Sequence, residues 1–444
     1  MLIIAYLANR FPATVEPYVA DEIGELRRRG VEVIPCSAQG PESSLHVLPN
    51  AGCESETLRL QPVRVLILLR AVVLMVRGWE RIAGLVARVL LKGKESPKRR
   101  LKALLHTWLG AYYAVLLRKR GVDHIHVHHG YFGSWIALVA ARLLGVSFSV
   151  TLHGSDLLLH GDYLDTKLKH CRFCVTVSEY NRRFLIKHFA GIDPEKIVVS
   201  RLGVDVPAYR VSHVREARAA PRRFSLLAVG RLHPVKDHAF LVRACARLHD
   251  HGLDFDCAIA GEGKERQRLE SLIRKEHLEG RVTLLGHVSS SQMGSLYRRA
   301  DVVVLTSRSE GLPLVLMEAM ARSKIVLAPV ITGIPEIVIV GKTGFLYAPG
   351  SLEDFVEKIL FLQRLILSED RFAVSHLDWI RYAARVQVLH NFNRKKQLSN
   401  FGDHFLRQIA PDFKNLDSRT PEFRDDPIFA FLEWSCPHED PILQ

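Results

Sequence analysis

The 444-residue sequence contains no uninterrupted apolar run of about 18 residues, the length that a helix needs to cross a bilayer. The longest apolar stretch, 65–76, is interrupted by Arg70 and followed by Arg77. The apolar start of the chain is short, has no basic segment before it, and continues into Arg10 and Pro12, unlike a secretion signal. We therefore expect a cytoplasmic protein without a membrane-spanning helix.

Cysteine is also scarce, and its spacing excludes two kinds of scaffold. The seven cysteines are an odd number at long intervals, which does not form a disulfide framework. Cys171 and Cys174 form a CxxC pair, but no second pair completes the four ligands of a structural zinc site. We expect both cysteines to pack on a helix as small hydrophobic residues.

Acidic residues are rare between Leu60 and Arg120. This segment holds 14 Lys/Arg against 2 Asp/Glu, so its balance of +12 nearly accounts for the net charge of +14 of the whole chain. A local excess of this kind indicates an anionic partner, either a nucleic acid or a lipid surface. The alternative is a basic face that contacts only solvent.

The same segment is strongly apolar and has a helical pattern. Its arginines lie mostly about two helical turns apart: Arg64, Arg70, Arg77, Arg81 and Arg88. Apolar faces with interleaved arginine suit a helix in a membrane interface that is attracted to anionic lipids. We expect 61–102 to dock on the inner face of a membrane, and we expect no nucleic acid partner because the first half lacks interleaved aromatic residues.

The chain is too long for one ordinary core, and about 150 residues per domain predicts two or three domains. Short apolar strands alternate with helices over 2–200 and again over 224–328, which is typical of parallel sheets covered by helices. We predict an α/β protein of two doubly wound Rossmann-like domains that face one another across a cleft. Ligands are expected at the carboxyl ends of the strands.

The domain limits follow from this alternation and from the polar, proline-bounded stretch in the middle of the chain. The predicted limits are 1–205 for the first domain with a helical insert at about 61–120, 206–221 for a linker, 222–370 for the second domain, 371–409 for helices that cross back to the first domain, and 410–444 for a poorly packed tail.

An apolar strand in the second half is followed by a polar loop and a helix with two glutamates, Glu310 and Glu318. Pro313 suits the first position of that helix because its φ is fixed. The backbone amides of Gly311 and Leu312 then lie at a helix N-terminus, where they can meet an anion. A carboxylate such as Glu318 in an apolar helix needs a polar partner, and a helix cap with a salt bridge is the alternative interpretation.

Another strand of the second half ends at Gly230, and two cations follow it, Arg231 and Lys236. Arginine offers a planar fork and lysine a mobile point charge to phosphate oxygens. A departing anion needs such donors already in place. Basic loop residues are common, so the motif is weak alone and strong beside the two glutamates. The next strand ends at Gly261 and Gly263, which we predict to form a ligand loop.

In the first half, a strand closes with His153, Gly154 and Asp156, again at a carboxyl end. An imidazole, a glycine and a carboxylate in this position indicate a functional loop. A structural histidine is the alternative.

A cluster of four histidines, His124, His126, His128 and His129, invites comparison with a metal site, since alternate residues share one face of a strand. No carboxylate or cysteine accompanies them with ligand spacing, so we predict no metal there. We predict that His128, followed by Gly130, lines the cleft.

These motifs together resemble the family 4 retaining glycosyltransferases of GT-B fold. The matching segments are the EX7E pair Glu310 and Glu318, the phosphate pair Arg231 and Lys236, His153-Gly-Ser-Asp156, and Gly333-Ile-Pro-Glu336. The segments Phe11-Pro-Ala-Thr-Val-Glu16 and His128-His-Gly130 are similar to enzymes of colanic-acid and other exopolysaccharide assembly. The resemblance covers about residues 1–400 and is most specific in the second half.

The resemblance implies a role for each matching residue. Arg231 and Lys236 bind the donor diphosphate, Glu318 holds the ribose hydroxyls, Glu310 contacts the hydroxyls of the donor sugar, and His153 lies beside that sugar. The other expected donor-binding residues are Gly230, Gly261, Gly263, Gly311 and Leu312. The expected acceptor-side residues are Asn9, Arg10, His128, Gly130 and Asp156. The family implies a nucleotide-diphosphate sugar as donor and neither metal nor cofactor, and we expect a lipid-linked glycan as acceptor.

Other classes agree with parts of the sequence. A nucleic-acid-binding α/β protein would account for the basic segment but not for the two glutamates. Another enzyme of the same fold, such as an epimerase or a phosphorylase, would need further acid–base carboxylates or a cofactor lysine, and neither pattern is present. The intact motif residues argue against a non-catalytic partner subunit.

Overall fold

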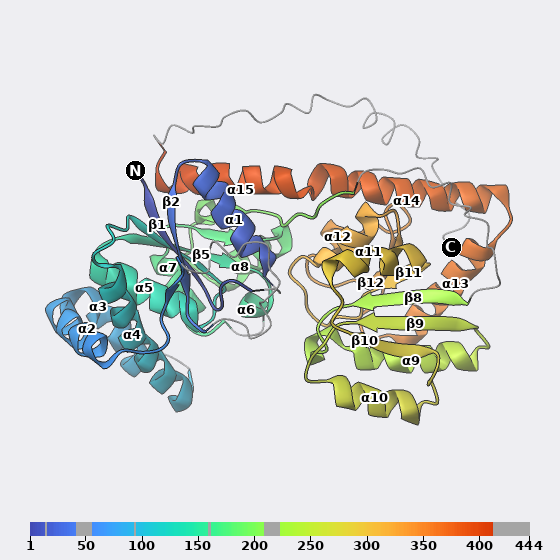
Figure 1. Cartoon of the computed structure of the whole chain (residues 1–444), viewed down its shortest axis with the longest axis horizontal. Coiled ribbons are helices and arrows are strands. Elements are labelled where there is room, and N and C mark those ends of the chain that lie inside the picture. Colours follow the sequence, from blue (N-terminus) through green and yellow to red (C-terminus); the bar gives the residue numbers. More distant parts are fainter. Residues whose placement is uncertain (14–15, 41–55, 93–94, 159–160, 208–222, 412–444) are drawn as a thin grey trace.

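The computed structural model describes residues 1–13, 16–40, 56–92, 95–158, 161–207 and 223–411. They form two parallel β-sheets, one of seven strands and one of six, each surrounded by helices (Figure 1). The prediction of two doubly wound Rossmann-like domains is thereby confirmed. Most of the predicted linker and nearly all of the predicted tail lie outside the described residues.

The first domain is built around the seven-stranded sheet, in the order β3-β2-β1-β4-β5-β6-β7. Its strands are β1 (Ile3–Ala8), β2 (Glu32–Ser37), β3 (Leu58–Arg59), β4 (His124–His128), β5 (Ser147–Leu152), β6 (Cys174–Thr176) and β7 (Ile197–Val199). Its helices are α1 (Pro17–Arg28), α2 (Val65–Arg77), α3 (Trp79–Leu91), α4 (Pro97–Leu117), α5 (Phe132–Leu144), α6 (Ser155–Leu158), α7 (Leu164–His170) and α8 (Glu179–His188). The strand order reverses between β1 and β4, where sheets of this type hold ligands.

The second domain has the sheet order β10-β9-β8-β11-β12-β13. Its strands are β8 (Phe224–Val229), β9 (Phe255–Ala260), β10 (Val282–Gly286), β11 (Val302–Val304), β12 (Ile325–Pro329) and β13 (Phe345–Tyr347). Its helices are α9 (His238–Asp250), α10 (Arg266–Lys275), α11 (Ser290–Arg299), α12 (Leu314–Ala321) and α13 (Leu352–Leu367). The reversal falls between β8 and β11, so the loops after these two strands are neighbours.

The apolar insert of the first domain is divided by one of its two glycines. Gly78 ends α2 and precedes α3, whereas Gly84 lies within α3. A Cβ at Gly78 would lie 2.8 Å from Cδ2 of Leu143, so the insert packs closely against α5 at this glycine. Among the described residues, no helix is long and apolar enough to span a membrane.

Cys171 and Cys174 are buried, as predicted, but they are not helical. Cys171 follows the last residue of α7, and Cys174 begins β6. The short intervening turn connects α7 to β6, an inner strand between β5 and β7, so the pair does not lie on a helix face.

Two long helices, α14 (Arg371–Asn391) and α15 (Arg394–Ile409), run across both domains (Figure 1). The helix α15 returns to the first domain, where Phe401, Phe405 and Leu406 pack with Ile4 and Tyr6 of β1 in one apolar cluster. The end of the chain therefore completes the core of the domain with which it began.

An ionic cluster fastens α15 to α1. The guanidinium of Arg29 donates to Glu25 at 2.7 Å, to the backbone oxygen of Ser399 at 2.7 Å, and to Asp403. The side chain of Arg29 is only 5% exposed, so its charge depends on these partners.

We predict that Arg29→Met lowers the free energy of unfolding of the first domain by about 3–5 kcal/mol, because it removes the buried guanidinium shared by Glu25 and Asp403 and leaves Glu25 only the exposed Arg28. Thermal and urea unfolding followed by circular dichroism would measure the change. The control is Arg268→Met, which removes a surface pair with Glu265 from a side chain that is 65% exposed. Equal loss in both variants would contradict the prediction.

Candidate functional site

Three loops of the second domain meet because they follow strands that lie side by side. The loop after β8 carries Arg231 and Lys236, the loop after β11 carries Glu310, and the loop after β9 carries Gly261. Nζ of Lys236 lies 2.6 Å from Oε1 of Glu310, and the hydroxyl of Ser307 donates to the same oxygen. The structure thus joins two motifs that are 74 residues apart in the sequence.

The backbone segments around Lys236 and Glu310 lie very close together. A Cβ at Gly261 would lie 1.9 Å from the carbonyl oxygen of Gly230, and a Cβ at Gly263 would lie 2.3 Å from that of Leu232. Both glycines therefore allow the loop after β9 to lie against the loop after β8. The hydroxyl of Thr306 also donates to the backbone oxygen of Lys236, at 3.0 Å.

Glu318 projects from α12 and is half-buried. Its polar partner is Tyr297 of α11, whose hydroxyl lies 2.7 Å from Oε2 of Glu318, and the guanidinium of Arg322 lies over the Tyr297 ring at 5.0 Å. We predicted Pro313 as the first residue of this helix, but it is the residue before the helix, because its ψ of 108° is extended. Gly311 and Leu312 still precede the N-terminus of α12.

The two domains touch through backbone atoms. A Cβ at Gly311 would lie 1.8 Å from the carbonyl oxygen of His153, and a Cβ at Gly154 would lie 2.8 Å from the amide nitrogen of Gly311. Asn181 also donates to the carbonyl oxygen of His153, at 3.0 Å. Glycine is required on both sides because any side chain would separate the domains here.

A second contact between the domains lies next to the first. The carboxylate of Glu336 accepts hydrogen bonds from the backbone amides of Glu179, at 3.1 Å, and Tyr180, at 2.7 Å. These amides begin α8, and a negative charge at a helix N-terminus is favourable. The Gly-Ile-Pro-Glu segment that fitted the family thus holds the domains together in this structure.

His128 and Asp156 do not contact an open surface, contrary to our prediction for acceptor-side residues. Both side chains are fully buried. Asp156 accepts hydrogen bonds from the backbone amides of Gly130 at 2.9 Å, His153 at 3.1 Å and Gly154 at 2.8 Å. Its carboxylate therefore shapes the loop that carries His153. His128 lies behind His153, with 2.9 Å between Nδ1 of His128 and Nε2 of His153.

The other expected acceptor-side residues lie at the switch point of the first sheet. Oδ1 of Asn9 is buried and has no hydrogen-bond partner among the described residues, so it is a candidate contact for a ligand. Arg10 donates to the side chain of Gln39 at 3.2 Å. Gly130 packs closely, since a Cβ there would lie 2.9 Å from Cδ2 of Leu152.

His129, which the sequence analysis considered only as a member of the histidine cluster, is a charged group. Its φ of 69° is left-handed, and the ring lies between two carboxylates, 3.0 Å from Oε1 of Glu16 and 3.6 Å from Oδ2 of Asp156. Burial alone would lower the pKa of His129, but the carboxylates of Asp156 and Glu16 raise it to about 10. His129 therefore carries a positive charge at neutral pH.

A possible set of metal ligands does include a carboxylate, contrary to our prediction for the histidine cluster. One side-chain atom each of Glu22, His126 and His128 lies within 4.8 Å of the others. However, the ring nitrogens of His126 are already within hydrogen-bond distance of Ser149 at 2.7 Å and Thr151 at 3.0 Å. The hydrogen-bonded arrangement accounts for these donors, and the absence of a metal stays a prediction.

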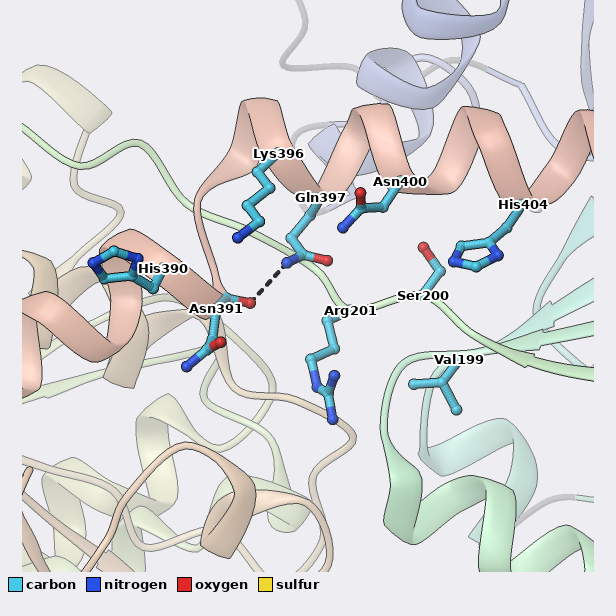
Figure 2. Close-up of a pocket in the computed structure, with 9 residues that line it drawn as sticks. All are labelled: Val199, Ser200, Arg201, His390, Asn391, Lys396, Gln397, Asn400 and His404. Atoms are coloured by element: carbon cyan, nitrogen blue, oxygen red, sulfur yellow. Dashed lines mark hydrogen bonds between the residues drawn. The ribbon is translucent and has the colours of Figure 1, made fainter. Parts of the chain in front are cut away.

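A cavity of about 230 Å³ lies away from these loops, between the end of β7 and the junction of α14 and α15 (Figure 2). Figure 2 shows Lys396 and Gln397 of α15 beside Arg201, with Gln397 donating to the backbone oxygen of Asn391 at 2.8 Å. Arg201 lies 3.5 Å from Glu336, so the cavity borders the contact between the domains. It contains none of the motif residues.

The raised pKa of His129 predicts a stability difference that depends on pH. The protonated ring stabilises the fold fully below its unfolded pKa of about 6.5, and this contribution is lost as the pH rises through about 10. His129→Gln should therefore destabilise the protein more at pH 6 than at pH 10. Melting temperatures of the variant and the wild type, measured across this range, would test the sign. A difference that grows with pH would contradict it.

The sequence matches two family descriptions that together cover most of the chain. "Glycosyltransferase Family 4" matches residues 15–207, and "Glycosyl transferases group 1" matches residues 213–373. WcaL of Salmonella typhimurium, named for colanic acid biosynthesis, is 32% identical over 211 residues, which are 46% of this chain and 50% of that relative. The D-inositol 3-phosphate glycosyltransferase of Pseudarthrobacter chlorophenolicus is 30% identical over 277 residues, which are 57% and 66%.

Solved structures show the same fold at low identity. Sucrose-phosphate synthase of Thermosynechococcus elongatus aligns with a TM-score of 0.70 at 17% identity, over 93% of this chain and 100% of that one. Anabaena HepE in complex with UDP-glucose aligns with a TM-score of 0.63 at 18% identity, over 91% and 99%. The chain spans about half the length of the WcaL relatives it matches. Both halves of the sequence and the arrangement of the two sheets show that the chain belongs to the family 4 glycosyltransferases of GT-B fold.

Proposed function

We propose that the protein transfers a sugar from a nucleotide-diphosphate sugar to a saccharide acceptor, with retention of configuration at the transferred carbon. The observation that supports this most is the pair of Lys236 and Glu310, 2.6 Å apart in loops after neighbouring strands. A cation suited to phosphate and a carboxylate suited to sugar hydroxyls thus lie together at the carboxyl end of a parallel sheet.

Arg231 and Lys236 are the proposed diphosphate ligands. Arg231 is exposed. Its charge reaches Glu16 of the first domain: burial raises the pKa of Glu16, but His129 and, more weakly, Arg231 lower it below its ordinary value. Negative charge develops on the diphosphate as its bond to the sugar breaks. Cations that are already in place stabilise that charge without further reorganisation.

The two glutamates have different proposed partners because their surroundings differ. Glu310 is held by Lys236 and Ser307 next to the contact between the domains. Its remaining lone pairs can therefore accept hydrogen bonds from hydroxyls of the donor sugar. Glu318 lies on the other side of α12 with Tyr297, and we assign it to the ribose hydroxyls. For retention, the departing phosphate takes the acceptor proton on the face of the sugar that it leaves.

The proposed donor class follows from related structures. Anabaena HepE was solved with UDP and with UDP-glucose, and the present chain shares its fold. Related WcaL proteins are named for colanic acid biosynthesis. We therefore propose a nucleotide-diphosphate sugar as donor, and an exopolysaccharide or related glycan as the product to which the chain contributes.

The helix α2 is apolar on two opposite faces. One face, which includes Ile67, Ala71 and Leu74, packs against the domain core. The other follows the i, i+3, i+4, i+7 spacing and consists of side chains that are 40–72% exposed: Val65, Leu66, Leu69, Val72, Val73 and Val76. An exposed apolar face of this kind marks a site of interaction.

The charges beside this face suggest what it contacts. Arg70 and Arg77 are exposed and flank it along one edge. Leu91 and Leu101, on α3 and α4, are likewise exposed, by 79% and 71%. Apolar side chains with flanking arginines fit an interface with anionic lipids. We propose that this surface docks on the cytoplasmic leaflet, where a lipid-linked acceptor would be at hand.

The position of the insert agrees with such docking. Helices α2, α3 and α4 lie at the end of the first domain that is distant from the second domain (Figure 1). Contact with a membrane there keeps the second domain, which carries the proposed donor ligands, away from the bilayer.

The donor assignment is tested with two variants that keep size and remove charge. Glu310→Gln should reduce transfer or donor hydrolysis on the order of 100-fold and largely spare nucleotide binding, because the carboxylate acts at the sugar. Glu318→Gln should weaken nucleotide binding on the order of tenfold, since hydrogen bonds to a charged group are worth about 1.5–3 kcal/mol. Initial rates and calorimetric titration measure the two effects.

A screen of UDP-, GDP- and ADP-sugars by thermal shift comes first and identifies the donor. Glu270→Gln serves as the control, because this carboxylate pairs with Arg266 on the surface of α10. No stabilisation by any nucleotide-sugar would refute the donor assignment. The reverse pattern of the two variants would show that their roles are exchanged.

The membrane proposal is tested by flotation with vesicles of phosphatidylcholine and phosphatidylserine. The triple variant Leu69→Gln, Val73→Gln, Val76→Gln should lower vesicle binding by about tenfold or more, because it removes three exposed apolar side chains from the interface. Arg70→Gln with Arg77→Gln should weaken binding to anionic vesicles by about tenfold and leave binding to neutral ones unchanged.

The matched control replaces exposed apolar residues of the C-terminal helices, Leu367, Phe372 and Leu389, by glutamine. It should leave flotation unchanged. Arg81 and Arg88 are kept in every variant because they hold the insert to the domain, through the backbone oxygen of Leu143 and through Asp165. Undiminished binding by the triple variant would rule out the proposed surface.

A further inference from the structure

A chain of buried polar contacts leads from His153 into the first domain. Nε2 of His153 lies 2.9 Å from Nδ1 of His128, and Nε2 of His128 lies 3.0 Å from Oε2 of Glu22. The hydroxyl of Tyr6 lies 3.0 Å from Nε2 of His128 and donates to Glu22. The side chain of His128 is fully buried and that of Glu22 is 7% exposed, so water competes little for these contacts.

The carboxylate at the inner end determines where the ring protons lie. A carboxylate oxygen beside an imidazole nitrogen requires a proton on that nitrogen, so Nε2 of His128 donates to Glu22. A neutral His128 then has only a lone pair at Nδ1. Nε2 of His153 must be the donor to that lone pair, which leaves Nδ1 of His153 without a proton.

A charged imidazole lies beside both rings of this pair. The ring of His129 lies 6.3 Å from that of His128 and 4.6 Å from that of His153, centroid to centroid, and it already carries a charge between Glu16 and Asp156. Burial and, next to it, the charge of His129 hold the pKa of His153 well below its ordinary value.

We propose that Glu22 and His128 are positioning residues that fix the tautomer of His153, so that its unprotonated Nδ1 accepts a hydrogen bond from a hydroxyl of the transferred sugar. The sugar contact rests on the proposed function, whereas the tautomer is a property of the free protein. Nδ1 of His153 has no hydrogen-bond partner among the described residues. It is also not one of the fully buried polar atoms that lack a partner, so it is not shut off from solvent. The ring of Tyr18 packs on His153 at 4.7 Å between centroids and holds its orientation.

The proposal assigns a specificity to the site. An acceptor nitrogen selects a sugar that has a hydroxyl at the facing carbon, because a deoxy sugar would leave the nitrogen unpaired. A histidine that served only the core would need no such chain. His124 is the example on the same strand: its ring lies 2.8 Å from the hydroxyl of Ser147 and 2.7 Å from that of Ser149, and both of its ring nitrogens are thereby paired.

The first experiment measures the tautomer directly. In the full chain labelled with ¹⁵N-histidine, ring nitrogen shifts at pH 8 distinguish protonated from unprotonated positions, and His153→Gln assigns the signals by their loss. We expect the proton of His153 on Nε2. A proton on Nδ1 would overturn the proposal, and this result does not depend on catalytic activity or on any variant of Glu22.

The second experiment changes the inner end of the chain. In Glu22→Leu the acceptor of the His128 proton is removed, and the hydroxyl of Tyr6, 3.0 Å from Nε2 of His128, can donate to that nitrogen instead. The proton of His128 then moves to Nδ1, and that of His153 moves to Nδ1 as well. We expect that switch, together with a fall in transfer rate on the order of tenfold and unchanged affinity for UDP. An unchanged His153 tautomer in Glu22→Leu would overturn the proposal.

His124→Gln is the matched control, since it alters an equally buried histidine of β4. It should leave the tautomer of His153 unchanged, and a switch in this control would also overturn the proposal. If the wild type turns over no nucleotide-sugar, the proposed function fails while the tautomer measurement still decides on Glu22 and His128. If Glu22→Leu does not fold, the wild-type tautomer decides alone.

Discussion

The contact between Gly154 and Gly311 determines where the rest of the site can lie. Two backbones meet there with no room for a side chain, because a Cβ at Gly311 would overlap the carbonyl oxygen of His153. The loop that carries the imidazole is therefore held against the loop that carries Glu310. The neighbouring carboxylate of Glu336 stabilises this arrangement by capping α8. Every proposed role on the donor side assumes this closeness.

The sequence could predict the residues that follow strands directly. Arg231, Lys236 and Glu310 come after short apolar strands, and parallel strands bring their carboxyl ends to one edge, so their meeting was foreseeable. The alternation of strands and helices predicted both sheets for the same reason, because each element has a local pattern. Ends of elements were less certain: Pro313 precedes α12 and does not begin it, since a single residue's φ fits either place.

Partners from distant segments could not be predicted. Glu22 is separated from His128 by 106 residues, and no spacing in the sequence connects a helix residue near the start with a histidine of β4. The burial of individual side chains could not be predicted either. The pattern around His128 and Asp156 correctly indicated polar chemistry at strand ends, but it could not distinguish a side chain that meets a ligand from one that supports its neighbour, and both are fully buried.

The arginines of the insert also show what composition alone cannot predict. Composition counts every arginine equally, whereas packing decides which of them face a partner. Arg81 and Arg88 are used inside the domain, by the backbone oxygen of Leu143 and by Glu95 and Asp165, while Arg70 and Arg77 stay exposed beside the apolar face of α2. The lipid surface is thus better argued from uncovered apolar side chains than from net charge, because solvated charge alone needs no partner and an exposed apolar face is costly without one.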